Sequence, residues 1–416
     1  MSERIVIKEI CEVYDGPHAT PKKTVDGPVY LGIDAITDDG KINAKEFAHL
    51  SEEDYIKWTK RVTPQYGDIV FSYEATLGRY ALIPKDFYGC LGRRLAIIRN
   101  VSKDIDTLWL YYYFLSPEWK QFIQSKIIKG STVNRISVED FPTYTVPNIS
   151  IKVQRKIANI LSKIDAKIAL NNNINDNLEQ QLTTLYDYWF TQFDFPNENG
   201  KPYQSSGGKM VMNNCLKKKI PNGWNVESVY SNQLSSIIKP GVDKFDTKTY
   251  FATADIKGTS LSSGTLIDYE SRENRANMQP NVNSVWFAKM KNSIKHLYLN
   301  EEMLPIISSS ILSTGFCGLQ CSDVSFEYMA SYISNTYFET HKDMLAHGAT
   351  QEAVNNDDLA GIHIVIPDDK TLQNYHRITH PIYSQISKNI CENQELVKIR
   401  DWLLPMLMNG QATIAD

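Results

Sequence analysis

One stretch decides the fold of this chain: residues 151–190 read IKVQRKIANILSKIDAKIALNNNINDNLEQQLTTLYDYWF. Its apolar residues recur mostly every third or fourth position, at Ile157, Ile160, Leu161, Ile164, Ile168, Leu178, Leu182, Leu185 and Trp189. This spacing puts them along one side of an α-helix, and neither proline nor glycine interrupts it. The pattern predicts one helix of about 35 residues, about 50 Å long. Such a helix needs a partner for its apolar stripe.

A second helix is predicted over residues 371–410. Its apolar residues are Ile378, Ile382, Ile386, Ile390, Leu396, Leu403 and Leu407. Pro381 and Pro405 lie inside this pattern, so we expect this helix to be kinked or shorter. The first helix is rich in asparagine at its middle, and an asparagine on the contact seam can fix the register of a helix pair. Two unrelated core helices are the alternative.

The two helices close two copies of a repeat. Residues recur in the same order at an offset of 218 to 220: Gly130-Ser131-Thr132 as Gly348-Ala349-Thr350, Asp140-Phe141 as Asp358-Leu359, Val146-Pro147 as Ile366-Pro367, Gln154 as Gln373 and Leu178 as Leu396. Self-similarity at a long fixed period indicates a duplicated structural unit. We expect a globular domain at 1–150, a helix at 151–190, a linker at 191–222, a second domain at 223–370 and a second helix at 371–410.

Both globular domains are expected to be α+β. Short β-rich runs lie at 68–72, 81–83, 95–98, 144–146, 284–287, 306–308 and 362–366. Residues 109–124 indicate a helix that is broken near Ser116-Pro117. Residues 191–222 are rich in Gly, Asn, Ser, Lys and Pro, which is typical of a linker, with Gly207-Gly208 as its loosest point. Lys217, Lys218 and Lys219 read as a solvated run, with phosphate contact as the minority interpretation.

Composition excludes several classes of protein. The chain has 416 residues, 42% hydrophobic and 22% charged, so it can build real cores and is not mainly disordered. No apolar run is long enough to span a bilayer, and the first residues lack an apolar signal core, so a cytoplasmic location is expected. The six cysteines are too scattered for a disulfide framework. A net charge of −4 neither predicts nor excludes a nucleic-acid partner.

Common catalytic signatures are absent. There is no GxxxxGK[ST] loop, HExxH, GxSxG or GxGxxG after a strand, and no Asn-Pro-Pro-Tyr or Asp-Pro-Pro-Tyr tetrapeptide. We interpret the eight histidines as forming no ligand-spaced set, and Cys317 and Cys321 as structural, because no second pair completes a four-ligand site. Together these absences favour a non-enzymatic role.

One family shares this arrangement of motifs. In order, they are Gly67-Asp68-Ile69-Val70, Gly130-Ser131-Thr132, Gln154-Arg155-Lys156-Ile157-Ala158, Ile160-Leu161, Ile164-Asp165, Leu178-Glu179, Leu185-Tyr186-x-x-Trp189-Phe190, Asn199-Gly200-Lys201-Pro202-Tyr203 and Ile220-Pro221-x-Gly223-Trp224. The chain resembles the DNA-specificity (S) subunit of type I restriction–modification enzymes, most closely over 128–225. The second half departs from the pattern: Asn283-Ser284 replaces Gly67-Asp68, and the second helix contains prolines.

The resemblance implies two target-recognition domains, each reading one half of a bipartite DNA site, separated by two antiparallel helices. Antiparallel pairing also follows from the chain order, because parallel helices would crowd both domains at one end. The family's partners are double-stranded DNA, two methylation subunits on the helical spacer and restriction–motor subunits. The resemblance further implies that the chain is non-catalytic and binds no cofactor, since S-adenosylmethionine, ATP and Mg²⁺ belong to the partner subunits.

Candidate DNA contacts are residues that can neutralise phosphates or reach base edges. In the first domain they are Lys22, Lys23, Arg79, Arg93, Arg94, Lys126, Lys129, Ser131, Thr132 and Arg135, with Asp15 and His18 in a loop that could also face DNA. In the second they are Lys244, Lys248, Arg272, Arg275, Lys289, Lys291, Thr350 and Gln351. The residues beside Gly130 are favoured, because a glycine loop lets the backbone approach a phosphate.

Two other functions stay open on the sequence. One is a DNA nuclease or methyltransferase whose catalytic motif is unrecognised, and the other is a coiled-coil scaffold with no DNA role. We interpret the chain as a non-catalytic, sequence-specific DNA-binding subunit that directs adenine methylation and restriction by its partners.

Overall fold

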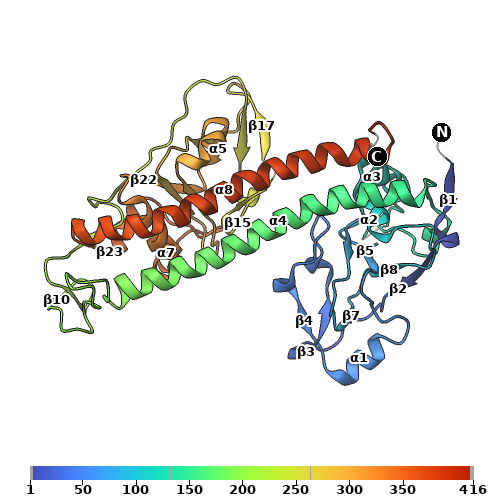
Figure 1. Cartoon of the computed structure of the whole chain (residues 1–416), viewed down its shortest axis with the longest axis horizontal. Helices are drawn as coiled ribbons and strands as arrows, with labels where there is room; N and C mark the ends of the chain where they lie inside the picture. Colours follow the sequence, from blue (N-terminus) through green and yellow to red (C-terminus); the bar gives the residue numbers. More distant parts are fainter. Residues whose placement is uncertain (1–2, 131–132, 263, 413–416) are drawn as a thin grey trace. The chain divides into compact units, whose positions relative to one another are not determined.

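A computed structural model describes residues 3–130, 133–262 and 264–412, in two compact units. Unit 1 comprises Met1–Ala166 and Val397–Asp416, and unit 2 comprises Lys167–Leu396. Two long helices, α4 (Ile151–Tyr186) and α8 (Asp369–Met408), each contribute to both units (Figure 1). None of the described helices is long and apolar enough to cross a membrane.

Helix α4 confirms the predicted long helix, with 36 residues, and continues into a π-helical turn, η5 (Asp187–Thr191). Helix α8 has 40 residues, so the expectation that it would be shorter is wrong. It runs through Pro381 and Pro405, although a proline inside a helix costs ~3 kcal/mol. Buried side chains on both sides of Pro381, among them Tyr375 and Tyr383, provide the packing that offsets this cost.

Unit 1 is an α+β unit built around a four-stranded antiparallel sheet in the order β2–β8–β5–β6. Its strands are β1 (Arg4–Val6), β2 (Cys11–Asp15), β3 (Thr24–Leu31), β4 (Ala48–His49), β5 (Ile69–Ser72), β6 (Tyr80–Leu82), β7 (Gly89–Leu91), β8 (Leu95–Asn100) and β9 (Thr145–Pro147). Strands β4–β3–β7 form a second sheet with β3 and β7 parallel, and β1 pairs with β9. The helices are α1 (Glu52–Trp58), α2 (Thr107–Leu115) and α3 (Pro117–Ser125), and the 3-10 turns are η1 (Ile7–Glu9), η2 (Ile33–Ala35), η3 (Ala44–Glu46) and η4 (Phe141–Thr143).

The predicted helix break is confirmed between α2 and α3. The Ser116 hydroxyl accepts a hydrogen bond from the Trp119 N–H at 3.3 Å, and Pro117 occupies the first turn of α3. A serine cap followed by proline starts a new helix, because proline needs no partner for a missing N–H. The break lets Trp119 turn into an aromatic core, where its indole N–H donates to the Tyr80 hydroxyl at 2.8 Å.

Unit 2 repeats this topology. Its strands are β10 (Met210–Asn213), β11 (Lys218–Pro221), β12 (Asn225–Ser228), β13 (Ser235–Ile237), β14 (Lys248–Phe251), β15 (Ile256–Lys257), β16 (Ser260–Leu261), β17 (Thr265–Ile267), β18 (Ala276–Met278), β19 (Ser284–Ala288), β20 (His296–Leu299), β21 (Ser310–Ser313), β22 (Phe316–Cys321) and β23 (His363–Ile366). Its shorter helices are α5 (Leu304–Ser309), α6 (Phe326–Ser334) and α7 (Thr336–Leu345), with 3-10 turns η6 (Thr253–Asp255), η7 (Glu301–Met303) and η8 (Asp357–Gly361).

The main sheets of the two units correspond, although unit 2 also has the strand pairs β10–β11 and β15–β16 and the extra strand β18. The order β13–β22–β19–β20 matches β2–β8–β5–β6, the parallel pair β14–β21 matches β3–β7, and β12–β23 matches β1–β9. The predicted repeat is therefore present in the fold. One predicted strand is wrong, because Ile306-Ile307-Ser308 lie in α5, whose first turn contains Pro305, and the strand follows at Ser310–Ser313.

The segment 191–222 is folded, unlike the loose linker that its composition suggests. The Asp194 carboxylate accepts hydrogen bonds from both the N–H and the hydroxyl of Ser205. The ring of Phe195 stacks on Tyr203 and on Trp224, with centroids 4.7 and 4.8 Å away. Gly207-Gly208 lies in a hydrogen-bonded turn rather than at a loose point, since the Gly208 N–H donates to the Tyr203 carbonyl. Buried aromatic residues such as Phe193 and Phe195 give the segment a small core, which its overall composition does not indicate.

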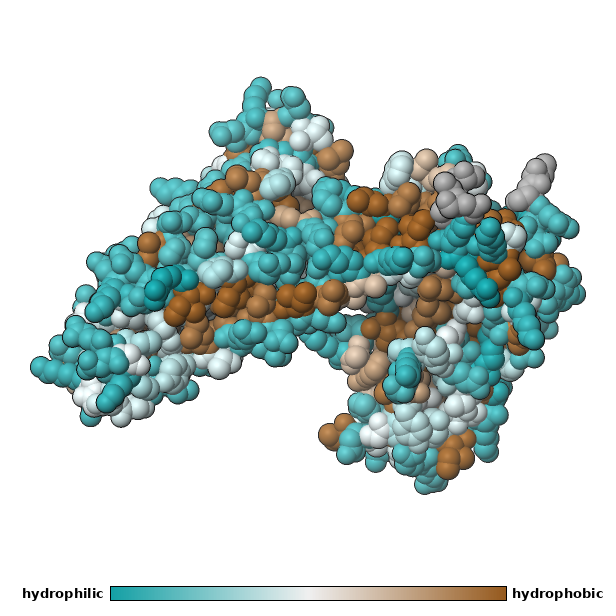
Figure 2. All heavy atoms as spheres, in the orientation of Figure 1, coloured by the Kyte–Doolittle hydropathy of each residue, from teal (hydrophilic) through white to brown (hydrophobic). Residues whose placement is uncertain are grey.

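Polar side chains set the pairing of α4 with α8 in unit 2. Asn171 donates to Asn393 at 2.9 Å, and Asn389 donates to Asn175 at 2.8 Å, so rising numbers on α4 meet falling numbers on α8. All four residues are buried. This contact confirms the antiparallel pairing in unit 2 and the expected seam position of the asparagines. Apolar side chains nevertheless remain exposed along both helices (Figure 2).

The asparagine contacts yield a testable expectation about stability. Removing one partner leaves a buried amide unsatisfied, so Asn389→Ala should lower the free energy of unfolding by ~1–3 kcal/mol. A double-mutant cycle with Asn175→Ala should give a coupling energy of at least ~0.5 kcal/mol. The exposed Asn173, changed to alanine, is the control and should have little effect. Additive effects of the two buried substitutions in urea unfolding would contradict the coupling.

In unit 1 an ion pair joins the two helices, beside an apolar cluster that contains Leu161 and Leu404. Asp165 of α4 lies 3.1 Å from Arg400 of α8 and 3.0 Å from Lys41, and it accepts a hydrogen bond from the Tyr112 hydroxyl at 2.7 Å. Burial by itself raises the pKa of Asp165, but Lys41, Tyr112 and Arg400 together hold it below the ordinary value of 3.8. The ionised carboxylate therefore stabilises the folded unit.

We expect Asp165→Asn to lower the free energy of unfolding at pH 7 by ~1–3 kcal/mol. Because the folded pKa is depressed, this contribution is present above pH 3.8 and is lost as the pH falls through the folded pKa. The difference between the two proteins should therefore shrink in denaturant titrations at acidic pH. Asp39→Asn, at an exposed position, is the control. A difference that did not depend on pH would argue against the ionic contact.

Candidate nucleic-acid interface

Both glycine loops of the repeat form small hairpins. In unit 1 the backbones of Ile128 and Arg135 exchange hydrogen bonds of 2.9 and 3.1 Å, and in unit 2 His347 and Ala353 exchange two of 3.1 Å. Each hairpin joins its own unit in the same way. The Ile136 N–H donates to the carbonyl of Tyr73, the residue after β5, and the Val354 N–H donates to the carbonyl of Lys289, the residue after β19.

The glycines of both loops are required by close backbone contact. A Cβ atom on Gly130 would lie 2.2 Å from the carbonyl oxygen of Val133, and one on Gly348 would lie 2.4 Å from that of Gln351. Both distances are below the closest contact that a real Cβ makes, so only glycine fits. In both units the added Cβ atom would collide with the carbonyl of the residue three positions later. This shared constraint supports the sequence repeat that relates the two loops. Ser131 and Thr132 lie outside the described residues.

The hairpin of unit 1 carries exposed positive charge. Lys129 and Arg135 are exposed, and neither side chain has a hydrogen bond or ion pair within the described part of the chain. Lys126 caps the end of α3, with its ammonium 5.4 Å from the ring centroid of Phe122. Nearby, Arg94 has a φ angle of 76° and lies 3.3 Å from the Glu74 carboxylate. Lys126, Lys129 and Arg135 are therefore available to an anionic ligand.

Asp15 and His18 lie beside this hairpin. His18 contacts Asp15 at 2.8 Å and the Tyr73 hydroxyl at 3.4 Å, and Tyr73 is the residue on which the hairpin docks. Burial and the Asp15 carboxylate raise the pKa of Tyr73 well above its usual range. Arg61, which sequence reasoning missed, lies 3.9 Å from Asp15 with an exposed side chain.

The hairpin of unit 2 is tied to two lysines that follow β19. Lys291 donates its backbone N–H to the Glu352 carbonyl at 3.0 Å, and its ammonium lies 2.7 Å from the Glu352 carboxylate. Lys289 donates its backbone N–H to the Gly315 carbonyl. The preceding residue, Thr314, donates its backbone N–H to the Arg275 carbonyl. Thr350 and Gln351 are exposed in the loop. The hairpin and the backbone segments bonded to it therefore carry five of the candidates: Arg275, Lys289, Lys291, Thr350 and Gln351.

A buried ion cluster supports this region. Lys342 is fully buried, and its ammonium donates to the carbonyls of Ala288 and Ser293, at the two ends of the turn that contains Lys289 and Lys291. The same ammonium lies 2.6 Å from Glu339, which also contacts His296 at 2.7 Å. Burial raises the pKa of Glu339, but His296 and Lys342 hold it below the ordinary value. In the sequence these residues look like ordinary surface charges, because their contacts are distant along the chain.

Residues 2–180 match the family model described as the type I restriction modification DNA specificity domain. The chain is 25% identical over 388 residues to the type I restriction enzyme MjaIX specificity subunit of Methanocaldococcus jannaschii, covering 88% of this chain and 82% of that protein. Residues 2–180 therefore carry the type I DNA specificity domain, and most of the chain is similar to a type I restriction enzyme specificity subunit.

Further similarity covers most of the chain. It is 21% identical over 404 residues to the type I restriction enzyme HindI specificity subunit of Haemophilus influenzae, covering 83% of this chain and 86% of that one. Among solved structures, an S subunit from M. genitalium aligns with a TM-score of 0.49 and 13% identity, over 98% of this chain and 96% of that chain.

Other candidate residues of the chain lie elsewhere. Arg79 is held by Asp38 at 2.6 Å and by the Ile36 carbonyl at 2.9 Å. Arg272 lies over the ring of Tyr269 at 3.9 Å, and Lys244 pairs with the neighbouring Glu270 at 3.6 Å. Lys248 donates to Gln279 at 3.1 Å. Lys22, Lys23 and Arg93 are exposed. The DNA-binding role of all of these residues stays a prediction.

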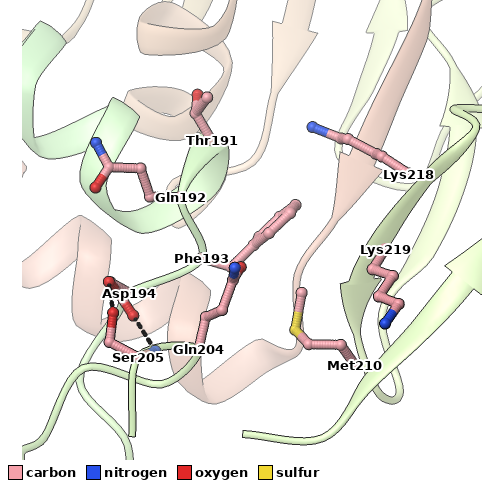
Figure 3. Close-up of a pocket in the computed structure, with 9 residues that line it drawn as sticks. All are labelled: Thr191, Gln192, Phe193, Asp194, Gln204, Ser205, Met210, Lys218 and Lys219. Atoms are coloured by element: carbon pink, nitrogen blue, oxygen red, sulfur yellow. Dashed lines mark hydrogen bonds between the residues drawn. The ribbon is translucent and has the colours of Figure 1, made fainter. Parts of the chain in front are cut away.

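Two lysines of the connecting segment, Lys218 and Lys219, line a cavity of about 510 Å³ together with Asp194 and Ser205 (Figure 3). The ammonium of Lys218 lies 5.0 Å from the ring centroid of Phe193, and burial lowers the pKa of Lys218. Lys217, Lys218 and Lys219 are all exposed, in agreement with the solvated run that the sequence predicts. Lys217 has a φ angle of 51°.

We expect Lys129→Ala to weaken binding of target DNA by the assembled protein. Loss of one phosphate contact should reduce the slope of log affinity against log salt by ~0.9 and leave folding stability within ~0.5 kcal/mol. Fluorescence anisotropy at several salt concentrations measures the slope. Lys103→Ala is a matched control, because Lys103 is exposed in unit 1 beyond the opposite end of β8 from Arg94. Equal slopes for the two variants would remove Lys129 from the interface.

Proposed function

We propose that this chain is a non-catalytic specificity subunit that recognises a bipartite DNA target, and that it directs adenine methylation and restriction by partner subunits. The observation that carries the proposal is the repeated hairpin. Each unit presents one glycine-dependent loop on the same topology, with basic residues beside it. Two copies of one DNA-contacting hairpin suit a target with two half-sites.

The two hairpins differ in the side chains that they present. Unit 1 offers Lys126, Lys129 and Arg135, whereas unit 2 offers Lys289, Thr350 and Gln351. Base recognition depends on the donor and acceptor pattern of such side chains, so two different half-sites are expected. Lysine and arginine favour phosphate and guanine, and glutamine favours adenine.

The methylation subunits are proposed to dock on the long helices. In unit 2, Leu170 is 53% exposed and Ile378 is 40% exposed. In unit 1, Ile399 is 46% exposed and Trp402 is 62% exposed. Apolar side chains on a helix surface that is already paired are typical of contact with another protein. Restriction–motor subunits would complete the assembly in the cytoplasm, where the DNA is found.

The chemistry is assigned to the partners. The sequence lacks the methyltransferase tetrapeptides and the phosphate-binding loop. S-adenosylmethionine, ATP and Mg²⁺ are therefore proposed to bind the methylation and restriction subunits and not this chain. The role of this chain is to position them on the target.

Reconstitution with the methylation subunits tests the proposal. Methylated-base sequencing of DNA treated with the complex should reveal a motif with two separated halves, and the chain alone should neither methylate nor cleave DNA. Activity of the purified chain with Mg²⁺ and S-adenosylmethionine would favour the enzyme alternative. A complex that forms but has no sequence preference in mobility shifts would favour the scaffold.

Replacement of residues 1–150 by the corresponding domain of another specificity subunit should change one half of the motif only. The partner subunits and the second domain stay the same, so the unchanged half serves as the internal control. A change in both halves would contradict the division into two independent readers.

A further inference from the structure

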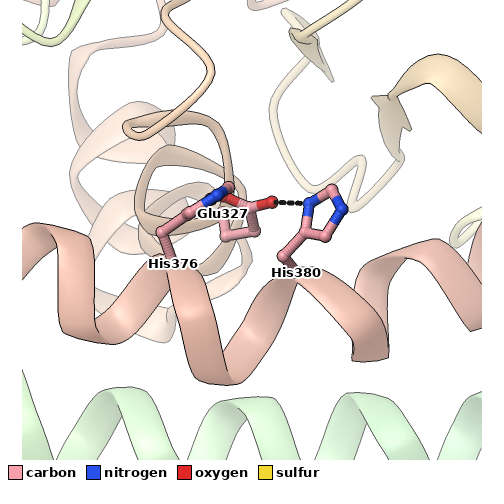
Figure 4. Close-up of side chains that lie close together, drawn as sticks. All are labelled: Glu327, His376 and His380. Atoms are coloured by element: carbon pink, nitrogen blue, oxygen red, sulfur yellow. Dashed lines mark hydrogen bonds and ion pairs between the residues drawn. The ribbon is translucent and has the colours of Figure 1, made fainter.

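Three potential metal ligands meet in unit 2, away from the hairpin. Glu327 comes from α6, and His376 and His380 come from α8, one turn apart (Figure 4). The Glu327 carboxylate lies 2.7 Å from Nδ1 of His376 and 2.9 Å from Nδ1 of His380. The ligand atoms of all three residues lie within 4.8 Å of one another.

The charge balance of this cluster calls for a cation. The Glu327 side chain is only 2% exposed, and within the described residues its ion-pair partners are the two imidazoles, with no lysine or arginine. A buried carboxylate is costly unless a positive charge or strong hydrogen bonds compensate it.

We propose that Glu327, His376 and His380 bind a divalent transition-metal ion, with Zn²⁺ as the best fit. Two imidazoles and one carboxylate form a mixed nitrogen–oxygen set that suits Zn²⁺, and histidines four positions apart on a helix share one face. Zinc bonds of ~2.0–2.2 Å would require the carboxylate and ring nitrogens to separate by about half an ångström. The His380 side chain is 53% exposed and has room to turn.

The exposure of the histidines also provides access. The His376 side chain is 23% exposed, so the site opens on the histidine side and is closed on the Glu327 side. An ion can enter from solvent, and water can complete the tetrahedral coordination. The bound ion would tie α6 to α8 and stabilise unit 2.

The equivalent positions of unit 1 carry no such ligands. At the offset of 219 that aligns Gln154 with Gln373, they are Leu108, Ile157 and Leu161. The shared fold therefore does not require a carboxylate and two histidines at this contact. Their presence in unit 2 alone is explained by a ligand that only unit 2 holds.

Metal titration of the full-length chain tests the proposal. After treatment with a chelator and its removal, the chain should bind one equivalent of Zn²⁺ in calorimetry with a dissociation constant below about 10 μM. Co²⁺ should give the intense visible absorption of a tetrahedral site. Added Zn²⁺ should raise the melting temperature by several degrees, because it binds only the folded chain.

Variants separate this site from chance binding. His380→Ala should weaken Zn²⁺ affinity at least tenfold, and His376→Ala with His380→Ala should abolish the cobalt spectrum. His341→Ala on α7 is the control and should bind like the wild type, since His341 lies outside the cluster. Because His380 is half exposed, its variant is expected to fold. Failure of the wild type to bind one equivalent, or unchanged binding by His380→Ala, would overturn the proposal, and neither result depends on the DNA-binding role.

Discussion

The pairing register of α4 and α8 in unit 2 is fixed by buried amides. Apolar side chains alone tolerate sliding by a helical turn, because one leucine or isoleucine contact resembles the next. Asn171 and Asn175 remove that freedom, since only one alignment places Asn393 and Asn389 opposite them. This register also decides which face of α8 meets the core of unit 2. With it, Tyr375 and Tyr383 point inward and donate or accept hydrogen bonds at Ser331.

An ion pair also joins the same two helices in each unit. In unit 2 it is Lys167–Glu392, at 3.1 Å. In unit 1 it is the largely buried pair of Asp165 and Arg400, which Lys41 and Tyr112 extend into the globular part of the unit. An ion pair responds to pH and salt, whereas an amide pair does not. Both units thus pair the helices with an ion pair, and unit 2 adds the buried amides that fix the register.

A duplicated fold with different loop chemistry suits a protein that reads two DNA sequences. The glycine contacts that shape both hairpins are set by backbone geometry and are the same in the two units. The side chains on the hairpins are exposed and free of that constraint, so they can differ without cost to the fold. In the proposed function, recognition is therefore separated from folding: strands β5 and β19 position the loops, and the exposed side chains of the loops are the proposed DNA contacts.

The sequence by itself determined the features that depend on local order. Helical periodicity located α4, the Ser116-Pro117 pair located the break between α2 and α3, and a constant offset revealed the repeat. The tertiary structure decided the features made by residues distant in the chain. It folded the segment 191–222 around Phe195 and Trp224 and buried Lys342 beneath the turn after β19. It also brought Glu327 to two histidines that the sequence left unassigned, although their spacing of four on one helix was a usable signal. The physical reason is that composition and spacing report what a segment can do alone, whereas burial and charge pairing depend on which segments meet.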